Sequence, residues 1–162
     1  MRDLGPLTSA RERSHVPVDL PVGDHAAFLW MAVATHALVG YTLGKVLLDE
    51  SAWGLLGGVA ADVDLLFPLA WQPPLVHRGI THTALAAVLL AVLAARWRRS
   101  AGLAVGTAYA SHLAIDATTP AGVALFYPLS TVRVDLALGG HSGTATVLLW
   151  IACLTALYWH RR

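Results

Sequence analysis

The chain has 162 residues, of which 56% are hydrophobic and only 13% are charged. About a quarter of the residues in a typical soluble domain are charged, so this composition argues against a soluble protein and indicates an integral membrane protein. The net charge of +1 and the single cysteine exclude a strongly basic surface for nucleic acid and an internal disulfide. The length corresponds to one domain.

Residues 1–26 are polar and contain prolines, and they lack the apolar core that precedes a signal-peptide cleavage site. We predict that they form a flexible polar tail. Residues 27–162 are predicted to form a helical membrane domain. Met31, near the start of this domain, is an alternative start of the chain.

Five apolar segments follow the tail, at about residues 27–48, 52–71, 82–97, 101–117 and 143–159. They are long, rich in alanine and leucine, and free of strict alternation, which predicts helices rather than strands. A spanning helix needs about 17–25 apolar residues, and the third and fourth segments are short by this measure. The sequence therefore predicts an all-α integral membrane bundle with four or five spans, in a multi-pass protein of the cell membrane.

Alternating spans would bring polar residues from several segments to one membrane face. The second segment ends near Asp62 and Asp64, the third begins at His82, and the fourth ends near His112 and Asp116. Successive spans run in opposite directions, so these three ends lie on the same side. The sequence is thus expected to gather its titratable side chains in one place.

The stretch "SHLAID" places His112 and Asp116 four residues apart. On a helix this spacing puts both side chains on one face, and it recurs in helix-borne zinc sites. The alternative is a histidine and an aspartate that hydrogen-bond to each other inside the bundle.

The stretch "DVD" places Asp62 and Asp64 two residues apart, shortly before Pro68. A carboxylate in the middle of a bilayer costs roughly 2.5–3.5 kcal/mol, so two of them favour a bound cation or a wet cavity. The alternative is that the pair marks the end of a helix at the lipid headgroups.

The stretch "HRGITH" is interpreted as a pair of ligands, His77 and His82. They converge if His77 lies in the loop and His82 in the first helical turn, with Gly79 allowing the turn and Thr81 as the expected N-cap. Arg78 either holds an anionic group through paired hydrogen bonds or anchors a lipid headgroup.

His36 completes the predicted metal site, although a lone histidine in an apolar helix is ordinarily a core hydrogen-bonding residue. His141, in a glycine-containing loop, is interpreted as a loop residue, with an approach to the metal site as the less favoured alternative. The predicted ligands are His36, Asp62, Asp64, His77, His82, His112 and Asp116. Nitrogen and carboxylate ligands suit a divalent metal, with zinc expected and manganese or iron as alternatives. Seven ligands exceed one tetrahedral site and leave room for two or more metals.

Four motifs in this order resemble those of the YdjM-like family of membrane-associated metal-dependent hydrolases, some of which are labelled LexA-binding. The motifs are Thr35, His36 and Gly40; Asp62 and Asp64; "HRGITH" at 77–82; and Ser111, His112, Asp116, Thr119 and Gly122. The resemblance extends from about residue 31 to residue 130. Many relatives have proline and serine where this chain has Ala61 and Thr83, but neither departure removes a predicted ligand.

The family is distantly similar to the zinc-dependent phospholipase C and single-strand nuclease superfamily, which implies a helical phosphoester hydrolase. We therefore predict a membrane-bound hydrolase that acts on a phosphoester or lipid-like substrate with an anionic group and uses the metal to activate water. Asp62 or Asp64 is an alternative general base, and Arg78 would steady the anionic group. The alternatives are a non-catalytic metal-containing protein that binds a regulator, and a metal or proton transporter. The sequence predicts contact with the lipid bilayer and gives no oligomeric state.

Overall fold

The structure, a computed structural model, describes residues 22–66 and 77–162. Within these residues the chain is all helical, as predicted, and no β-strand forms. The elements are α1 (Val22–Leu48), α2 (Ser51–Val59), the short 3₁₀ helices η1 (Ala60–Leu66) and η2 (Ile80–His82), α3 (Ala84–Ala95), α4 (Arg99–Ala117) and α5 (Gly143–His160). Helix α1 begins at Val22, before residue 27, where the first apolar segment is predicted to start. Most of the predicted tail, and the end of the second apolar segment, lie outside the described residues.

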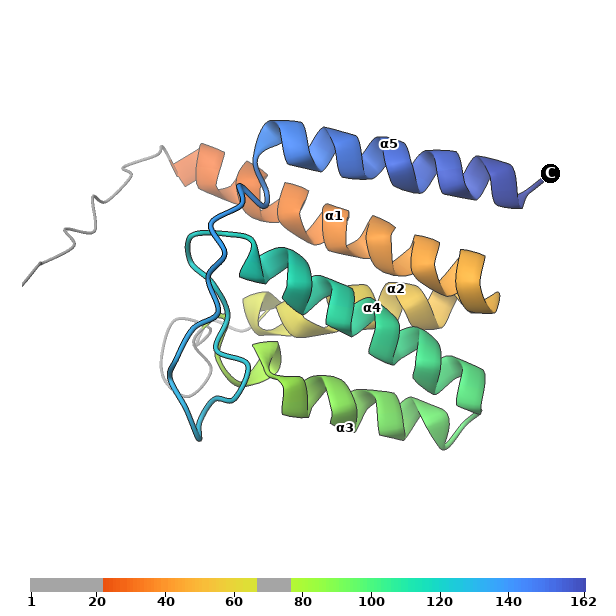
Figure 1. Cartoon of the computed structure of the whole chain (residues 1–162), viewed down its shortest axis with the longest axis horizontal. Helices are drawn as coiled ribbons and strands as arrows, with labels where there is room; N and C mark the ends of the chain where they lie inside the picture. Colours follow the sequence, from red (N-terminus) through yellow and green to blue (C-terminus); the bar gives the residue numbers. More distant parts are fainter. Residues whose placement is uncertain (1–21, 67–76) are drawn as a thin grey trace, which may run out of the picture.

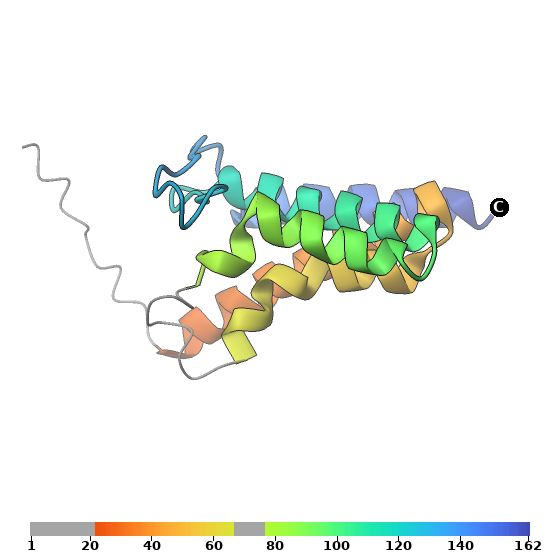
Figure 2. The same ribbon diagram turned by 90° about the horizontal axis from the view of Figure 1, so that it is seen from below.

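The helices lie side by side with their long axes roughly aligned (Figure 1). Helix α4 packs against α1, α2 and α3, while α5 packs along α1. The long connection between α4 and α5 lies at the same end of the bundle as η1 and η2, and Figure 2 shows the same grouping from below. This end of the bundle therefore collects residues from every part of the described chain.

Two helices in the described part of the chain are long and apolar enough to cross a membrane, Leu29–Leu48 in α1 and Gly143–His160. Helix α3 is apolar but has only 12 residues, which is about 18 Å of helix against a hydrocarbon core of about 30 Å. The second apolar segment unwinds into η1 after Val59. Two spans are thus supported by length and composition, and the predicted number of four or five is not confirmed.

Helix α5 leaves most of its apolar surface uncovered, because among the other helices it packs mainly along α1. Val147, Leu148, Ile151 and Leu154 are all exposed. Exposed apolar side chains along a helix of this length are expected where the helix faces lipid.

Helices α1 and α2 approach closely because glycines face each other across their contact. A Cβ atom added to Gly54 would lie 2.3 Å from the carbonyl oxygen of Gly40 and 2.7 Å from the Cα atom of Gly44. Small residues of this kind let helix backbones come together in membrane proteins. The same contact continues to Gly58, whose added Cβ would lie 2.4 Å from the carbonyl oxygen of His36. It therefore holds the end of α2, and η1 after it, against His36.

The change from α-helix to 3₁₀ helix at η1 explains how two aspartates only two residues apart both face inward. In an α-helix such residues point about 160° apart, whereas three residues per turn in a 3₁₀ helix reduce this to about 120°. Asp62 and Asp64 are both buried, and Val63 between them is exposed.

Glu50 joins two helical hairpins at the opposite end of the bundle. Its carboxylate lies 3.0 Å from Arg98 Nη2 and accepts a hydrogen bond of 2.6 Å from the Ser100 hydroxyl. Glu50 is buried, so Glu50→Ala removes the acceptor for both groups and is expected to lower the free energy of unfolding by about 1–2 kcal/mol. Chemical denaturation in detergent measures this. Asp49→Asn, which removes the charge from an exposed ion pair with Lys45 and keeps a side chain that tolerates the backbone φ of 55° at this position, is the control and should leave stability unchanged.

Candidate metal centre

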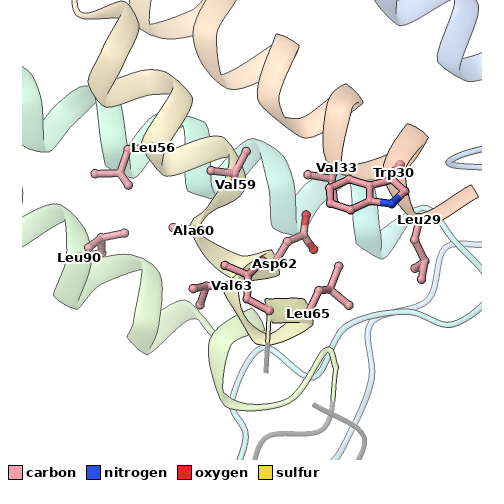
Figure 3. A pocket seen from close by; sticks show the side chains of 11 residues that line it. Leu29, Trp30, Val33, Leu56, Val59, Ala60, Asp62, Val63, Leu65 and Leu90 are labelled. Atoms are coloured by element: carbon pink, nitrogen blue, oxygen red, sulfur yellow. The ribbon is translucent and has the colours of Figure 1, made fainter. Parts of the chain in front are cut away.

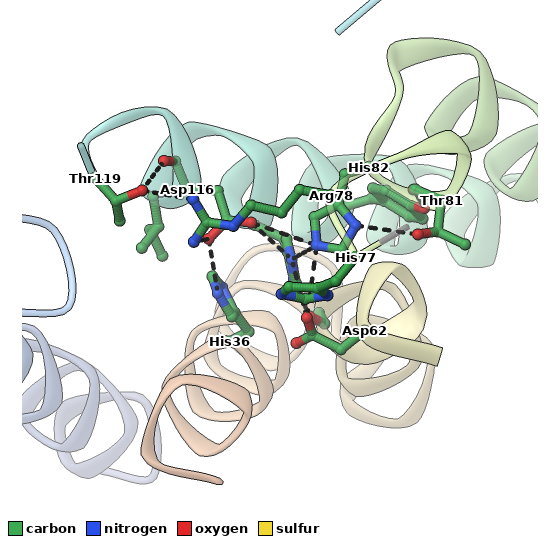
Figure 4. Close-up of polar contacts among 12 residues, drawn as sticks. His36, Asp62, His77, Arg78, Thr81, His82, Asp116 and Thr119 are labelled. Atoms are coloured by element: carbon green, nitrogen blue, oxygen red, sulfur yellow. Dashed lines mark hydrogen bonds and ion pairs between the residues drawn. The ribbon is translucent and has the colours of Figure 1, made fainter. Parts of the chain in front are cut away.

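The polar end of the bundle contains a cluster that we call the His/Asp centre (Figure 4). Helix α1 contributes one residue, η1 two, the segment from His77 to His82 two, and α4 two. The residues are His36, Asp62, Asp64, His77, His82, His112 and Asp116. The structure brings together all seven side chains that the sequence predicts as ligands, and each lies within 3.7 Å of at least one other.

Three donor atoms in the centre have the mutual spacing of ligands in a tetrahedral metal site, and a fourth lies near two of them. His82 Nε2, His112 Nε2 and Asp116 Oδ2 lie 3.3, 3.4 and 3.5 Å apart. Asp62 Oδ1 lies 3.6 Å from His82 Nε2 and 3.7 Å from His112 Nε2. Ligands bonded to zinc at about 2.0–2.1 Å in a tetrahedron lie about 3.3–3.4 Å from one another. His82, His112 and Asp116 could therefore hold a divalent cation, with Asp62 close enough to two of them to be a further ligand.

His112 is oriented by the backbone of α2. Its Nδ1 donates a hydrogen bond of 2.7 Å to the carbonyl oxygen of Gly58. A carbonyl can only accept, so Nδ1 carries a proton, and in the neutral form of the ring the lone pair of Nε2 faces the other donor atoms. Such a hydrogen bond on the far side of the ring is the usual partner of a metal-binding histidine. The sequence pattern of α4 supplies Asp116 one turn later on the same face.

The protonation states of Asp62 and His82 suit a cation. For His112, by contrast, burial is outweighed by the contact with Asp116 and the nearby charge of Asp62, which place the pKa above its ordinary value. Burial raises the pKa of Asp62, but its contact with His82 and the nearby charges of His112 and His36 outweigh burial, and the pKa lies below its ordinary value. The pKa of His82 lies below its ordinary value. Burial lowers it most, and the nearby charges of His112 and His77 add to this, which together outweigh the opposite effect of Asp62 and Asp116. An ionised carboxylate and a neutral imidazole are the forms that bind metals. Within the described residues, Asp62 Oδ2 and His36 Nδ1 are buried without a hydrogen-bond partner, which leaves further donor atoms available.

Asp64 lies at the edge of the centre and holds other residues in place. His77 Nδ1 lies 3.1 Å from one of its oxygens, and the Thr81 hydroxyl donates a hydrogen bond of 3.0 Å to the other. Thr81 is therefore not the N-cap of the following helix. Thr83 caps α3 instead, accepting a hydrogen bond from the backbone of Ala86, because η2 closes at His82 and delays the start of α3.

Arg78 binds the centre rather than projecting from it. Its Nη2 atom lies 3.0 Å from Asp116 Oδ1, and its Nη1 atom donates to the Thr119 hydroxyl at 2.6 Å and to the carbonyl oxygen of Gly122 at 3.2 Å. The guanidinium thereby fixes one Asp116 oxygen and ties the loop after α4 to the "HRGITH" segment. Its role toward an anionic ligand stays a prediction.

His141 lies against the His/Asp centre, in line with the less favoured of its two interpretations. It is buried, and its Nε2 atom lies 3.2 Å from Asp116 Oδ1. With His36 Nε2, which lies 3.5 Å from the same oxygen, it forms a second group that could hold a metal. The signal was available, because His141 stands two residues before an apolar helix, as His82 stands two residues before α3.

The model of the family described as YdjM inner membrane protein matches residues 31–162. This range includes every residue of the His/Asp centre and all the helices after the first part of α1. No curated protein and no solved structure matches the chain.

Proposed function

Because the chain belongs to the YdjM inner membrane protein family, we propose that it is a membrane-bound, metal-dependent hydrolase of phosphoester or lipid-like substrates. One observation carries the proposal: two histidine nitrogens and one carboxylate oxygen, buried at one end of the bundle, have the mutual spacing of tetrahedral metal ligands, and a second carboxylate oxygen lies within 3.7 Å of both nitrogens. Buried histidine and aspartate without thiolate favour a hard or borderline divalent cation, with zinc as the first choice.

The four donor residues Asp62, His82, His112 and Asp116 would hold one cation. A bound divalent cation supplies Lewis acidity toward a phosphoryl oxygen and makes water a better nucleophile near neutral pH. Asp62 Oδ2, which has no hydrogen-bond partner in the described structure, is the oxygen best placed to accept a proton from water. Through its contacts with His77 and Thr81, Asp64 would hold the segment from His77 to His82 in place beside the donor atoms.

A second cation near His36 and His141 is less favoured than the first. Both histidines approach Asp116 Oδ1, but the Arg78 guanidinium lies 3.0 Å from that same oxygen. A positive side chain in this position repels a further cation. We infer that Arg78 occupies the place of a second cation beside His36 and His141.

The proposal is tested by measuring the metal content of the purified full chain and its hydrolysis of generic phosphodiesters and phosphomonoesters, with and without a chelator. We expect bound metal and turnover that the chelator abolishes. His112→Ala should lose at least about 100-fold in metal affinity, since loss of a supporting residue alone costs about 10–100-fold, and its turnover should fall in parallel. His160→Ala, at the exposed end of α5, is the matched control and should retain both properties.

Two outcomes would replace the proposal. Full metal content without turnover on any phosphoester would favour a non-catalytic protein that uses the metal to support a binding surface. Metal flux in liposomes containing the protein would favour a transporter.

A further inference from the structure

An apolar cleft of about 700 Å³ lies beside the His/Asp centre, bounded by the first half of α1, the α2–η1 segment and α3 (Figure 3). Its walls include Trp30 and Val33 from α1, Leu56 from α2 and Leu90 from α3, and Asp62 is the only charged residue among the described lining. The volume falls within the range of about 300–1,000 Å³ that is common for ligand sites.

Asp62 connects the cleft to the His/Asp centre. Its Oδ1 atom lies 3.6 Å from His82 Nε2 and 3.7 Å from His112 Nε2, so it belongs to the donor set. Its Oδ2 atom is buried without a hydrogen-bond partner, and the side chain also lines the cleft. A ligand in the cleft would therefore have an apolar wall along its length and the polar centre at one point of its surface.

The rim of the cleft is apolar as well. Trp30 and Leu66, which both line it, are largely exposed, and Val63 is partly so. In a membrane protein family, exposed apolar side chains at the end of a candidate span are expected to meet lipid. An occupant could thus enter from the bilayer without crossing water.

We propose that the apolar cleft holds one hydrocarbon chain of a membrane amphiphile whose phosphate-bearing head lies at the His/Asp centre. This inference rests on the proposed function, since it names the class of substrate: a phosphoester with a long alkyl chain. The cleft contributes affinity through the chain, at most about fourfold for each buried methylene group, while the centre acts on the head.

The chain offers a matched pair of variants for the test. Leu55 and Leu56 are neighbours on α2 with exposed fractions of 41% and 42%, but only Leu56 lines the cleft. Leu56→Trp should fill the cleft, and Leu55→Trp should add the same bulk outside it. The probes are dodecyl phosphate and butyl phosphate, and their binding to the metal-loaded full chain is measured by calorimetry at a fixed concentration of one nonionic detergent.

We expect dodecyl phosphate to bind at least tenfold more tightly than butyl phosphate to the unmodified chain and to Leu55→Trp. In Leu56→Trp this advantage should fall below about threefold, with the affinity for butyl phosphate unchanged. Equal advantages in the two variants, or none in the unmodified chain, would overturn the proposal. If Leu56→Trp loses metal, Val33→Trp fills the same cleft from α1 and is compared in the same way.

The proposed hydrolase function is tested in a separate experiment, which measures the turnover of a short-chain phosphodiester. Turnover without an effect of alkyl chain length on binding would contradict the proposal for the cleft and would support the proposed hydrolase function. An effect of alkyl chain length that Leu56→Trp abolishes, without turnover of any phosphoester, would support the amphiphile site and would contradict the proposed hydrolase function.

Discussion

Asp116→Asn is expected to lower the affinity for a divalent cation by at least about 100-fold. Asp116 Oδ2 lies 3.4 Å from His82 Nε2 and 3.5 Å from His112 Nε2, so it is central to the donor set. The amide that replaces it has no negative charge to balance a cation, and it leaves the Arg78 guanidinium without its carboxylate partner. Loss of residues that merely support metal ligands costs about 10–100-fold, so a direct ligand should reach or exceed the upper limit. Titration against a competing chelator measures the affinity.

Two aspartates provide controls for this variant. Asp135→Asn changes an exposed residue of the α4–α5 connection and should leave metal affinity unchanged. Asp64→Asn removes a residue that contacts His77 and Thr81 at the edge of the centre, and its effect should lie between the other two, at about 10–100-fold. Metal affinity of Asp116→Asn within threefold of the unmodified chain would exclude the tetrahedral donor set.

The sequence predicted which residues meet because their positions at helix ends follow from simple alternation. His112 and Asp116 share a helix face by spacing alone, and the ends that carry Asp62 and His82 fall on the same side of the bundle. Their function as metal ligands stays a prediction. The spacing could not predict the different contacts of the two aspartates. Asp64 contacts His77 and Thr81, whereas Asp62 contacts His82 and His112, and these partners lie farther along the chain.

Contacts across long loops were the hardest part of the site to anticipate. Arg78 meets Asp116 near the end of α4 and Thr119 in the connection between α4 and α5, both far along the chain from Arg78. His141 reaches the centre through the same connection, with a backbone φ of 61° that few non-glycine residues adopt. Neither arrangement follows from hydropathy or from helical spacing, which describe the neighbours of a residue along one element only.

The helical class followed from composition and periodicity, but the number of spans did not. Apolar runs indicate that a segment is buried in protein or lipid without saying which, and they do not reveal where an α-helix gives way to a 3₁₀ turn. The second segment reads as about 20 apolar residues, yet its helix stops at Val59. Unwinding at that point turns both aspartates of η1 inward, so the departure from a simple spanning helix is the feature that builds the site.

Gly54→Ala is expected to lower the free energy of unfolding by about 3 kcal/mol, at the upper end of the cost of overpacking. The new methyl group would lie 2.3 Å from the carbonyl oxygen of Gly40 and 2.7 Å from the Cα atom of Gly44. Both neighbours are backbone atoms, so no side chain can rotate away and the two helices must separate. Denaturation in detergent, followed by circular dichroism, measures the loss.

Separation of α1 from α2 should also weaken the His/Asp centre, because that contact holds Gly58, two residues before the start of η1, against His36. Metal affinity is therefore expected to fall together with stability, although Gly54 itself touches no donor residue. Gly143→Ala is the control: no atom lies within 4 Å of the added methyl group, and alanine at a helical position is neutral or stabilising by up to about 1 kcal/mol. If Gly54→Ala proved as stable as Gly143→Ala, the two helices could not approach each other this closely, and the position of η1 beside His36 would need another cause.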